Sequence, residues 1–332
     1  MMARPLTPDP SGQDAITIGL VNNMPDSAFS STERQFQTLL SAAAGNRLVR
    51  VRLFTLPGVP RGEAALALAR GRYEDIGALS TNEPVDGLIV TGAEPLAANI
   101  RDEPYWTSLT DLVGWAGKHT ISTVWSCLAA HAAVLHLDGI ARRPVGPKLS
   151  GVFDCAKSAD HPIVAGLPVQ WRTPHSRYNE LPEDALLANE YQILSRSADA
   201  GVDLFAKDER SLFLFVQGHP EYDVGALLRE YRRDVTRFLT GERDTYPDMP
   251  RFYFGPEEAA AFAEFRLRAL ENPTGDLLPD FPVGGIETML KHSWRASAIA
   301  LYANWMGYLS ERKSRRSLPA RTVTPQVLSG AR

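Results

Sequence analysis

Short apolar runs alternate with segments of helical periodicity through the first half of the chain. Runs of strand length lie at 15–21, 48–55, 87–90 and 120–125. Helical spacing or helix-start signals occur between them, at 31–44, 64–70, 105–118 and 128–137. A buried strand followed by a covering helix is the repeating unit of a parallel sheet. The alternation therefore predicts an α/β domain with a largely parallel sheet.

The pattern changes after about residue 150, where strand-like runs follow one another closely. They lie at 149–153, 192–195, 202–206 and 212–216, and helical spacing returns at 224–239, 257–270 and 287–312. In the last of these segments the apolar positions form a stripe from Trp294 to Leu309, which indicates core packing. We expect one domain over 15–312, with a flexible leader at 1–14 and a basic tail at 313–332.

Composition excludes several classes of protein. With 332 residues, 44% hydrophobic, 22% charged and a net charge of -4, the chain is ordinary for a globular protein, and nothing points to nucleic acid or a membrane surface. Residues 1–14 lack the apolar core of a signal peptide, and no apolar run reaches membrane-spanning length. The two cysteines, Cys127 and Cys155, do not make a disulfide framework. We expect a cytoplasmic protein.

Cys127 stands where an apolar strand meets a helix. In open α/β sheets, ligands bind at the carboxyl ends of strands. A thiol at that edge also faces a helix N-terminus, whose N–H groups and dipole favour the thiolate and offer oxyanion donors. Position alone does not separate this interpretation from that of a buried structural cysteine.

His219 leaves the carboxyl end of another strand, and Glu221 follows two residues later. Both side chains can lie on the same side of an extended segment. A carboxylate beside an imidazole fixes its tautomer and stabilises the imidazolium, and the imidazole can take the proton of a thiol. A cysteine at one strand end and His-x-Glu at another is a rarer combination than either feature alone, so the two together indicate a catalytic site.

Cys155 lies inside a strand-like run, with no helix start beside it, and we expect it to be structural. The seven histidines show no metal-ligand spacing near acidic residues beyond His219 and Glu221. We therefore expect no metal site.

The Cys…His-Pro-Glu arrangement resembles the class I glutamine amidotransferase superfamily. Within it, residues from about 16 to 305 are similar to the homoserine O-succinyltransferase (homoserine O-acyltransferase) family of methionine biosynthesis. The motifs that carry the resemblance are NMP at 23–25, TERQF at 32–36, DGLIVTGA at 86–93, YW at 105–106, KLSGV at 148–152, PHSRY at 174–178, GHPEYD at 218–223, RDV at 233–235 and SWR at 293–295. The fold implied is a flavodoxin-like open sheet with flanking helices.

The resemblance implies a ping-pong acyl transfer. Cys127 attacks the thioester carbonyl of an acyl-CoA, and His219, oriented by Glu221, then deprotonates the hydroxyl of an amino acid. The oxyanion is held by backbone N–H groups, of Leu128 and of the 92–96 turn, with Leu96 as the second donor.

The same resemblance implies the substrates and their contacts. Arg233 pairs with the substrate carboxylate, for which a bidentate guanidinium is suited, and Lys148 and Ser176 bind substrate or acyl group. The co-substrate is an acyl-CoA, with succinyl-CoA favoured and acetyl-CoA the other candidate, and no further cofactor is expected. The acceptor is L-homoserine, and the protein is expected to be a homodimer.

Several positions depart from the family pattern. The loop at 26–30 lacks the usual lysines, Leu128 stands where better-known members have Trp, and Leu96 fits neither usual choice in the turn beside the acyl chain. Residues 255–285 look like an insertion. These departures indicate a divergent subgroup, for which an L-serine O-acyltransferase of cysteine biosynthesis is an alternative.

Two alternative hypotheses assign the chain to other classes of protein. Glutamine amidotransferases typically carry Gly-x-Cys-x-Gly around the nucleophile, whereas this chain has WSCLA at 125–129, with neither glycine. A non-catalytic binding protein on the same fold is the other alternative, since a fold does not fix a function. The joint presence of Cys127, His219, Glu221 and Arg233 favours the enzyme.

Overall fold

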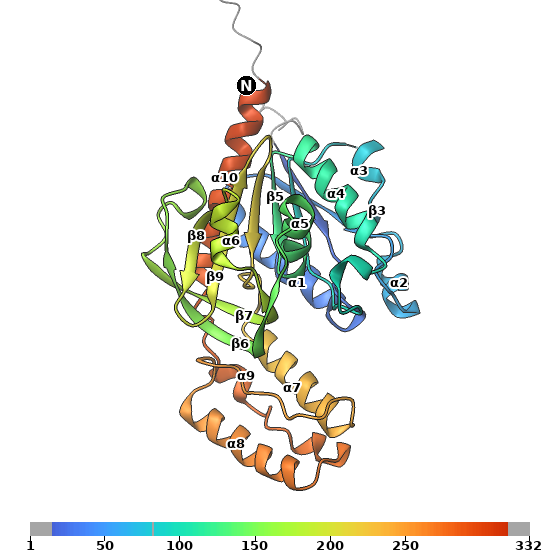
Figure 1. Cartoon of the computed structure of the whole chain (residues 1–332), viewed down its shortest axis with the longest axis vertical. Coiled ribbons are helices and arrows are strands. Elements are labelled where there is room, and N and C mark those ends of the chain that lie inside the picture. The colour runs from blue at the N-terminus through green and yellow to red at the C-terminus, as the bar shows by residue number, and fades with distance from the viewer. Residues whose placement is uncertain (1–14, 82, 318–332) are drawn as a thin grey trace, which may run out of the picture.

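The computed structural model of the protein describes residues 15–81 and 83–317. Within these residues the strands form one 10-stranded sheet in the order β3-β2-β1-β4-β5-β10-β9-β8-β6-β7 (Figure 1). The strands are β1(Ile16–Val21), β2(Val49–Thr55), β3(Glu74–Asp75), β4(Gly87–Val90), β5(Ser122–Ser126), β6(Arg143–Lys157), β7(Gln170–Glu180), β8(Gln192–Ser197), β9(Gly201–Asp208) and β10(Leu212–Val216).

The sheet has a parallel half and an antiparallel half. Strands β2, β1, β4, β5 and β10 run parallel in that order, with short β3 added parallel at the edge. Numbered among themselves, the first five have the order 2-1-3-4-5 of flavodoxin-like folds. Strands β9, β8, β6 and β7 continue the sheet in antiparallel pairs. The α/β open sheet expected from the sequence is thus confirmed.

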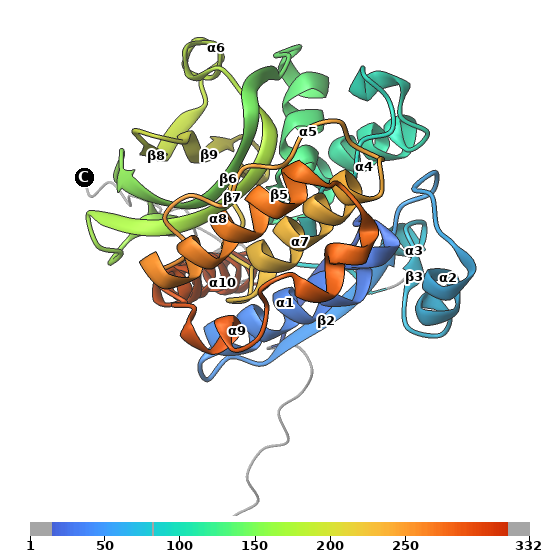
Figure 2. The same ribbon diagram turned by 90° about the horizontal axis from the view of Figure 1, so that it is seen from below.

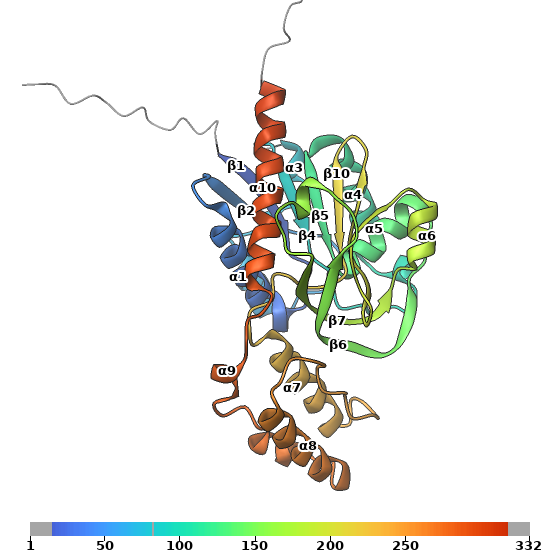
Figure 3. The same cartoon turned by 90° about the vertical axis from the view of Figure 1, so that its left-hand side faces the viewer.

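Helices cover both faces of the sheet. They are α1(Asp26–Ala44), α2(Glu63–Ala69), α3(Ala78–Thr81), α4(Trp106–His119), α5(Leu128–Asp138), α6(Glu183–Ala188), α7(Ala226–Leu239), α8(Pro256–Glu271), α9(Ile286–Met289) and α10(Arg295–Ser317), with short 3-10 turns η1(Ile100–Asp102), η2(Pro162–Val164) and η3(Gly275–Asp280). Figure 3 shows α1 and α10 on one face and α4, α5 and α6 on the other. Each face buries its own apolar cluster, which is why β1, β4 and β10 are apolar at almost every position.

Helix α10 packs closely against the central strands of the sheet. Its Trp305 is 1% exposed and donates from Nε1 to Ser122 Oγ at 2.9 Å, while Leu309 is fully buried. A Cβ at Gly87 of β4 would lie 2.7 Å from Leu309 and 2.9 Å from Trp305, so the helix approaches the sheet as closely as a glycine allows. The stripe that the sequence predicted to be core packing is confirmed.

Helices α7, α8 and α9 form a separate layer below the sheet, on the side where β10 ends (Figures 1 and 2). Residues 255–285 supply α8 and η3 of this layer. Phe262 and Phe281 pack around Tyr231 of α7, with ring centroids 5.4 and 5.9 Å from its ring. This third apolar cluster holds α7 against the edge of the sheet where the predicted site residues lie.

Several expectations about elements were wrong. The helix expected over 287–312 is two helices, α9 and α10, and α10 continues to Ser317, inside the segment expected to be a basic tail. Helix α1 begins at Asp26 rather than near residue 31, with Pro25 as its N-cap. A proline costs nothing at a helix start because the first N–H groups have no partner inside the helix. Strand β7 was not predicted at all, and β6 is far longer than 149–153. The two pair along their length, and β7 escaped notice because its polar residues and Pro174 hide the alternation.

Candidate active site

Cys127 occupies the turn between β5 and α5. Its φ of 51° and ψ of -114° are strained for a residue with a side chain, and its N–H donates to Val216 O of β10 at 2.7 Å. The half-buried thiol is held at the N-terminus of α5. A sharp strand-to-helix turn of this kind exposes the nucleophile of other α/β enzymes.

The N–H of Leu128 lies beside this thiol. Leu128 is the first residue of α5, so no carbonyl earlier in the helix accepts its N–H. Gly92, which follows β4, passes close by, and a Cβ there would lie 3.0 Å from Leu128 N and 3.1 Å from Leu128 Cβ. The lack of a side chain at Gly92 keeps the space beside this N–H open. The arrangement suits the oxyanion role predicted for Leu128.

His219 and Glu221 form a buried pair next to the thiol. The Nδ1 atom of His219 lies 2.8 Å from Glu221 Oε1, and its ring stacks on Tyr222 with centroids 4.3 Å apart. Burial alone would lower the pKa of His219, but the Glu221 carboxylate and a hydrogen bond with Cys127 outweigh it and raise that pKa well above its usual value. The geometry thus favours an imidazolium between a carboxylate and a sulfur.

Leu96 lies outside this arrangement. Its side chain is 66% exposed, and its N–H donates to Glu103 Oε1 at 2.7 Å, as does that of Ala97 at 2.9 Å. A donor already bound to a carboxylate does not hold an oxyanion, so the structure does not support the prediction for Leu96. Gly92 and Ala93 border the cavity in its place.

Lys148, Ser176 and Arg233 come together around two acids of α7. The ammonium of Lys148 lies 3.0 Å from Glu230 and 2.8 Å from Asp234, and Ser176 Oγ donates to Glu230. Arg233 donates from Nε and Nη2 to Asp234 Oδ1, at 2.9 and 2.8 Å. The predicted substrate-binding residues therefore form one network, in which both cations are already paired.

Asp234 is buried, and the other charged groups of this network are partly buried. Burial would raise the pKa of Glu230, but Lys148 and Arg233, together with hydrogen bonds from Ser176 and Tyr222, lower it to about 2. Lys148 is only 11% exposed, and its pKa is raised because Glu230 and Asp234 outweigh the cost of burial. The two cations and two carboxylates of the network thus balance in formal charge.

Sequence reasoning missed Glu230 and Asp234. They lie four residues apart on α7, in a charge-rich segment that looked like a solvated helix face. The available signal was their helical spacing around Arg233, which puts all three within reach of one partner.

These groups border a cavity of about 330 Å³. Its walls include the catalytic and substrate-binding residues expected from the sequence, namely Cys127, Leu128, Lys148, Ser176, His219, Glu221 and Arg233. The volume is of the size that holds a small ligand or the acyl end of a larger one.

No helix of 15–81 and 83–317 is long and apolar enough to cross a membrane.

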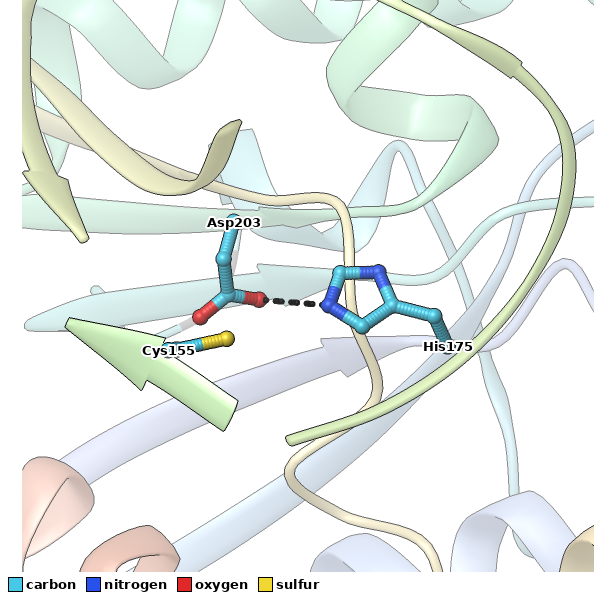
Figure 4. A group of neighbouring side chains, drawn as sticks. All are labelled: Cys155, His175 and Asp203. Carbon is cyan, nitrogen blue, oxygen red and sulfur yellow. Dashed lines mark ion pairs between the residues drawn. The ribbon is translucent and has the colours of Figure 1, made fainter. Parts of the chain in front are cut away.

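Cys155, His175 and Asp203 form a second group of side chains (Figure 4). The group lies against Gly218, the residue before His219. His175 Nε2 is 3.3 Å from Asp203 Oδ1, and Asp203 Oδ2 accepts from Ser195 at 2.9 Å. Burial raises the pKa of the Cys155 thiol, as expected for a structural cysteine. A Cβ at Gly218 would lie 2.7 Å from Asp203 Oδ1, so the group sets the path of the chain into His219.

The hydrogen bonds of this group decide between a metal site and a polar network. Arg177 Nε donates to His175 Nδ1 at 3.4 Å. Since arginine is always a donor, Nδ1 accepts and Nε2 of neutral His175 carries the hydrogen. Nε2 and Asp203 Oδ1 lie 3.3 Å apart, but neither atom has a hydrogen-bond partner among the described residues. A nitrogen that carries a hydrogen has no lone pair for a metal. The group is therefore best described as a support for the loop that carries His219.

Comparison with known proteins shows the family of the chain. The family model described as homoserine O-succinyltransferase matches residues 10–315. The homoserine O-succinyltransferase of Methylorubrum extorquens is 46% identical over 300 residues, covering 90% of this chain and 89% of that protein. The one from Bradyrhizobium japonicum is 46% identical over 297 residues, covering 89% and 90%. Over nearly its whole length, then, the sequence is that of an acyltransferase.

The chain belongs to the homoserine O-succinyltransferase family, as its motifs led us to expect. Among solved structures, a glutamine amidotransferase from Thermotoga maritima covers 89% of this chain with 98% of its own length, at 12% identity and a TM-score of 0.48. A glutamine amido transferase from Methylobacillus flagellatus covers 89% with 95% of its length, at 14% identity and a TM-score of 0.49. Similarity at this level does not bear on activity.

Proposed function

We propose that the protein transfers the succinyl group of succinyl-CoA to the hydroxyl of L-homoserine through an acyl-enzyme on Cys127. The observation that carries the proposal is the buried His219–Glu221 pair, 2.8 Å apart, beside a cysteine held in a strained turn at a helix N-terminus. That arrangement places a protonated imidazole beside the sulfur that acts as the nucleophile. Family membership supplies the substrates, because the relatives are named for homoserine and succinyl transfer.

In the first half-reaction the thiolate of Cys127 attacks the thioester carbonyl, and a sulfur–carbon bond forms. The oxyanion accepts hydrogen bonds from the N–H of Leu128 and from the Gly92–Ala93 segment. When the tetrahedral intermediate collapses, the bond to the CoA sulfur breaks, and His219 gives its proton to that sulfur. Free CoA leaves, and the succinyl group remains on Cys127.

In the second half-reaction the homoserine hydroxyl takes the place of CoA. His219, now neutral, removes the hydroxyl proton as the oxygen attacks the thioester of Cys127. Collapse releases O-succinylhomoserine and restores the thiolate and the imidazolium. Glu221 accepts from His219 Nδ1 throughout, which keeps Nε2 available for the proton transfer.

The charge network of α7 suits a zwitterionic acceptor. Homoserine brings one carboxylate and one ammonium, and the network offers two cations, Lys148 and Arg233, against two carboxylates, Glu230 and Asp234. An amino acid can therefore exchange internal ion pairs for its own without leaving a buried charge unpaired. Tyr222 connects this network to the catalytic pair, because its hydroxyl donates to Glu230 at 2.5 Å and its ring stacks on the imidazole of His219. We therefore expect the hydroxyl of an acceptor bound in the network to lie near His219.

The test measures release of free CoA thiol from succinyl-CoA or acetyl-CoA, each with homoserine or serine. Wild type is compared with Cys127→Ala, and with Cys155→Ala as the matched control. We expect turnover with succinyl-CoA and homoserine, none with Cys127→Ala, and a succinyl mass adduct on Cys127 when the acceptor is left out. Preference for acetyl-CoA or for serine would overturn the substrate assignment. If neither turnover nor adduct occurs with any pair, a non-catalytic binding protein becomes the better description.

A further inference from the structure

Arg142 lies just before β6 and lines the same cavity as Cys127. It is half-buried, and among residues 15–81 and 83–317 its guanidinium makes no hydrogen bond and no ion pair. Burial lowers the pKa of Arg142, with Tyr105, Cys127 and Glu103 acting in the opposite direction. An arginine nevertheless stays charged in a protein. The cavity therefore contains, beside Cys127, a positive charge that no described residue pairs with.

The other basic side chains of the cavity wall are already engaged. Lys148 and Arg233 are held by the acids of α7, and Arg237 forms an ion pair with Glu94 at 2.9 Å. Arg177 donates to the carbonyl of Asn179 at 2.8 Å and to other acceptors around it. Arg142 thus differs from its neighbours in having nothing in the described protein to neutralise it.

Glu103 is the carboxylate that acts on the pKa of Arg142, but no ion pair within 4.0 Å joins the two among the described residues. Its Oε1 accepts the N–H groups of Leu96 and Ala97, at 2.7 and 2.9 Å. Glu103 therefore fixes the turn through Oε1, while its buried Oε2 has no hydrogen-bond partner among the described residues and lies beyond ion-pair distance of the Arg142 guanidinium.

We propose that Arg142 binds the free carboxylate of the acyl donor and so selects a dicarboxylic acyl group over an uncharged one. The proposal rests on the proposed function, since it requires the acyl group to enter this cavity. The substrates bring more than one anion to the site. The carboxylate of the acceptor has the α7 network, whereas the distal carboxylate of a succinyl thioester lies only three carbon–carbon bonds from the carbonyl that Cys127 attacks. A guanidinium beside Cys127 is suited to meet it bidentately.

The test uses a pair of donors that differ only at the far end of the acyl chain. Succinyl-CoA and butyryl-CoA both carry four-carbon acyl groups, but only the first ends in a carboxylate. Their kcat/KM values are measured for wild type, Arg142→Met and Arg142→Lys, with homoserine as acceptor. Arg143→Met is the matched control, because Arg143 is exposed, pairs with Glu180 at 2.8 Å and does not line this cavity.

We expect Arg142→Met to lose roughly 10- to 100-fold in kcat/KM with succinyl-CoA, the range of a charge-assisted hydrogen-bonded pair. Butyryl-CoA should lose nothing or gain, Arg142→Lys should recover part of the loss, and Arg143→Met should behave as wild type. Equal losses with both donors would overturn the proposal and point to a CoA phosphate or to a structural role. Unchanged kinetics with both donors would overturn it as well. If wild type acylates Cys127 with neither donor, the proposed function fails instead, and the adduct measurement separates the two failures.

Discussion

Replacing Gly92 by alanine tests whether the N–H of Leu128 stabilises an oxyanion. The new Cβ would lie 3.0 Å from Leu128 N and 3.1 Å from Leu128 Cβ, closer than ordinary van der Waals contact. An oxyanion must sit at about 2.9 Å from the same nitrogen to accept its hydrogen bond. Methyl and oxyanion therefore compete for one space. Losing one oxyanion donor costs about 2.7–4 kcal/mol, or 10²- to 10³-fold in kcat.

The assay is the rate of acyl-enzyme formation at saturating succinyl-CoA, followed by mass spectrometry, together with the urea midpoint of unfolding. Gly92→Ala should slow acylation 10²- to 10³-fold and shift stability by at most about 1–3 kcal/mol, because the contacts are tight but few. Gly114→Ala is the control, since a Cβ in that part of α4 meets nothing within 4 Å. It should keep full activity and gain stability by about 0.5–1 kcal/mol. A fully active, stable Gly92→Ala would refute the reasoning.

Two further substitutions test the catalytic pair and the layer beneath it. Glu221→Gln removes the carboxylate that raises the pKa of His219, so the basic limb of the pH–rate profile for acylation should move to lower pH, and an unmoved limb would argue against the ion pair. The same carboxylate stabilises protonated His219 in the fold, an effect that is complete below the unfolded-state pKa of about 6.5 and is lost as pH rises through the folded-state pKa; the stability deficit of Glu221→Gln in urea unfolding should therefore be largest on the acid side. Phe262→Ala removes a ring that is 1% exposed and packs between Tyr231 and Phe281. The cavity left behind should lower the free energy of unfolding by about 3–5 kcal/mol. Leu267→Ala on the same helix, 65% exposed, should stay within about 0.5 kcal/mol, and equal losses in the two variants would contradict the buried role of α8.

The parts of the fold that sequence could predict are those governed by local periodicity. The apolar strands of the parallel half and the helices between them follow from hydrophobic patterning, and so does the placing of Cys127 and His219 at strand ends. Strand β7 could not be predicted in this way, because its residues serve the site instead of a sheet face. Ser176 Oγ, for example, donates to Glu230, and Thr173 Oγ1 donates to Asp203 Oδ2 at 3.3 Å. Polar residues needed at the site therefore replace the alternation of apolar and polar residues by which a strand is predicted.

The candidate site was predictable in its chemistry and only partly in its geometry. Cys127, His219 and Glu221 have side chains whose chemistry is distinctive at any position. Arg142 and Arg143 are adjacent and chemically identical, and only the path of the chain into β6 decides that one lines the cavity while the other pairs with Glu180. Backbone donors are harder still, since every residue has an N–H, and Leu96 was chosen without knowledge of Glu103. The homodimer and the cytoplasmic location stay predictions.

The packing of α10 against β1, β4 and β5 bears on how the protein is made. Trp305 binds Ser122, and Lys313 Nζ binds Asp86 at 2.8 Å and Ala15 O at 2.7 Å, contacts that bridge up to 298 positions of sequence. A ribosome delivers β1, α1 and β4 long before it delivers α10, so the part of the sheet face that α10 covers stays open for most of translation. Contacts so distant in sequence close late and slowly. Until α10 emerges, the apolar residues of that part of the face are exposed to chaperones and to other nascent chains.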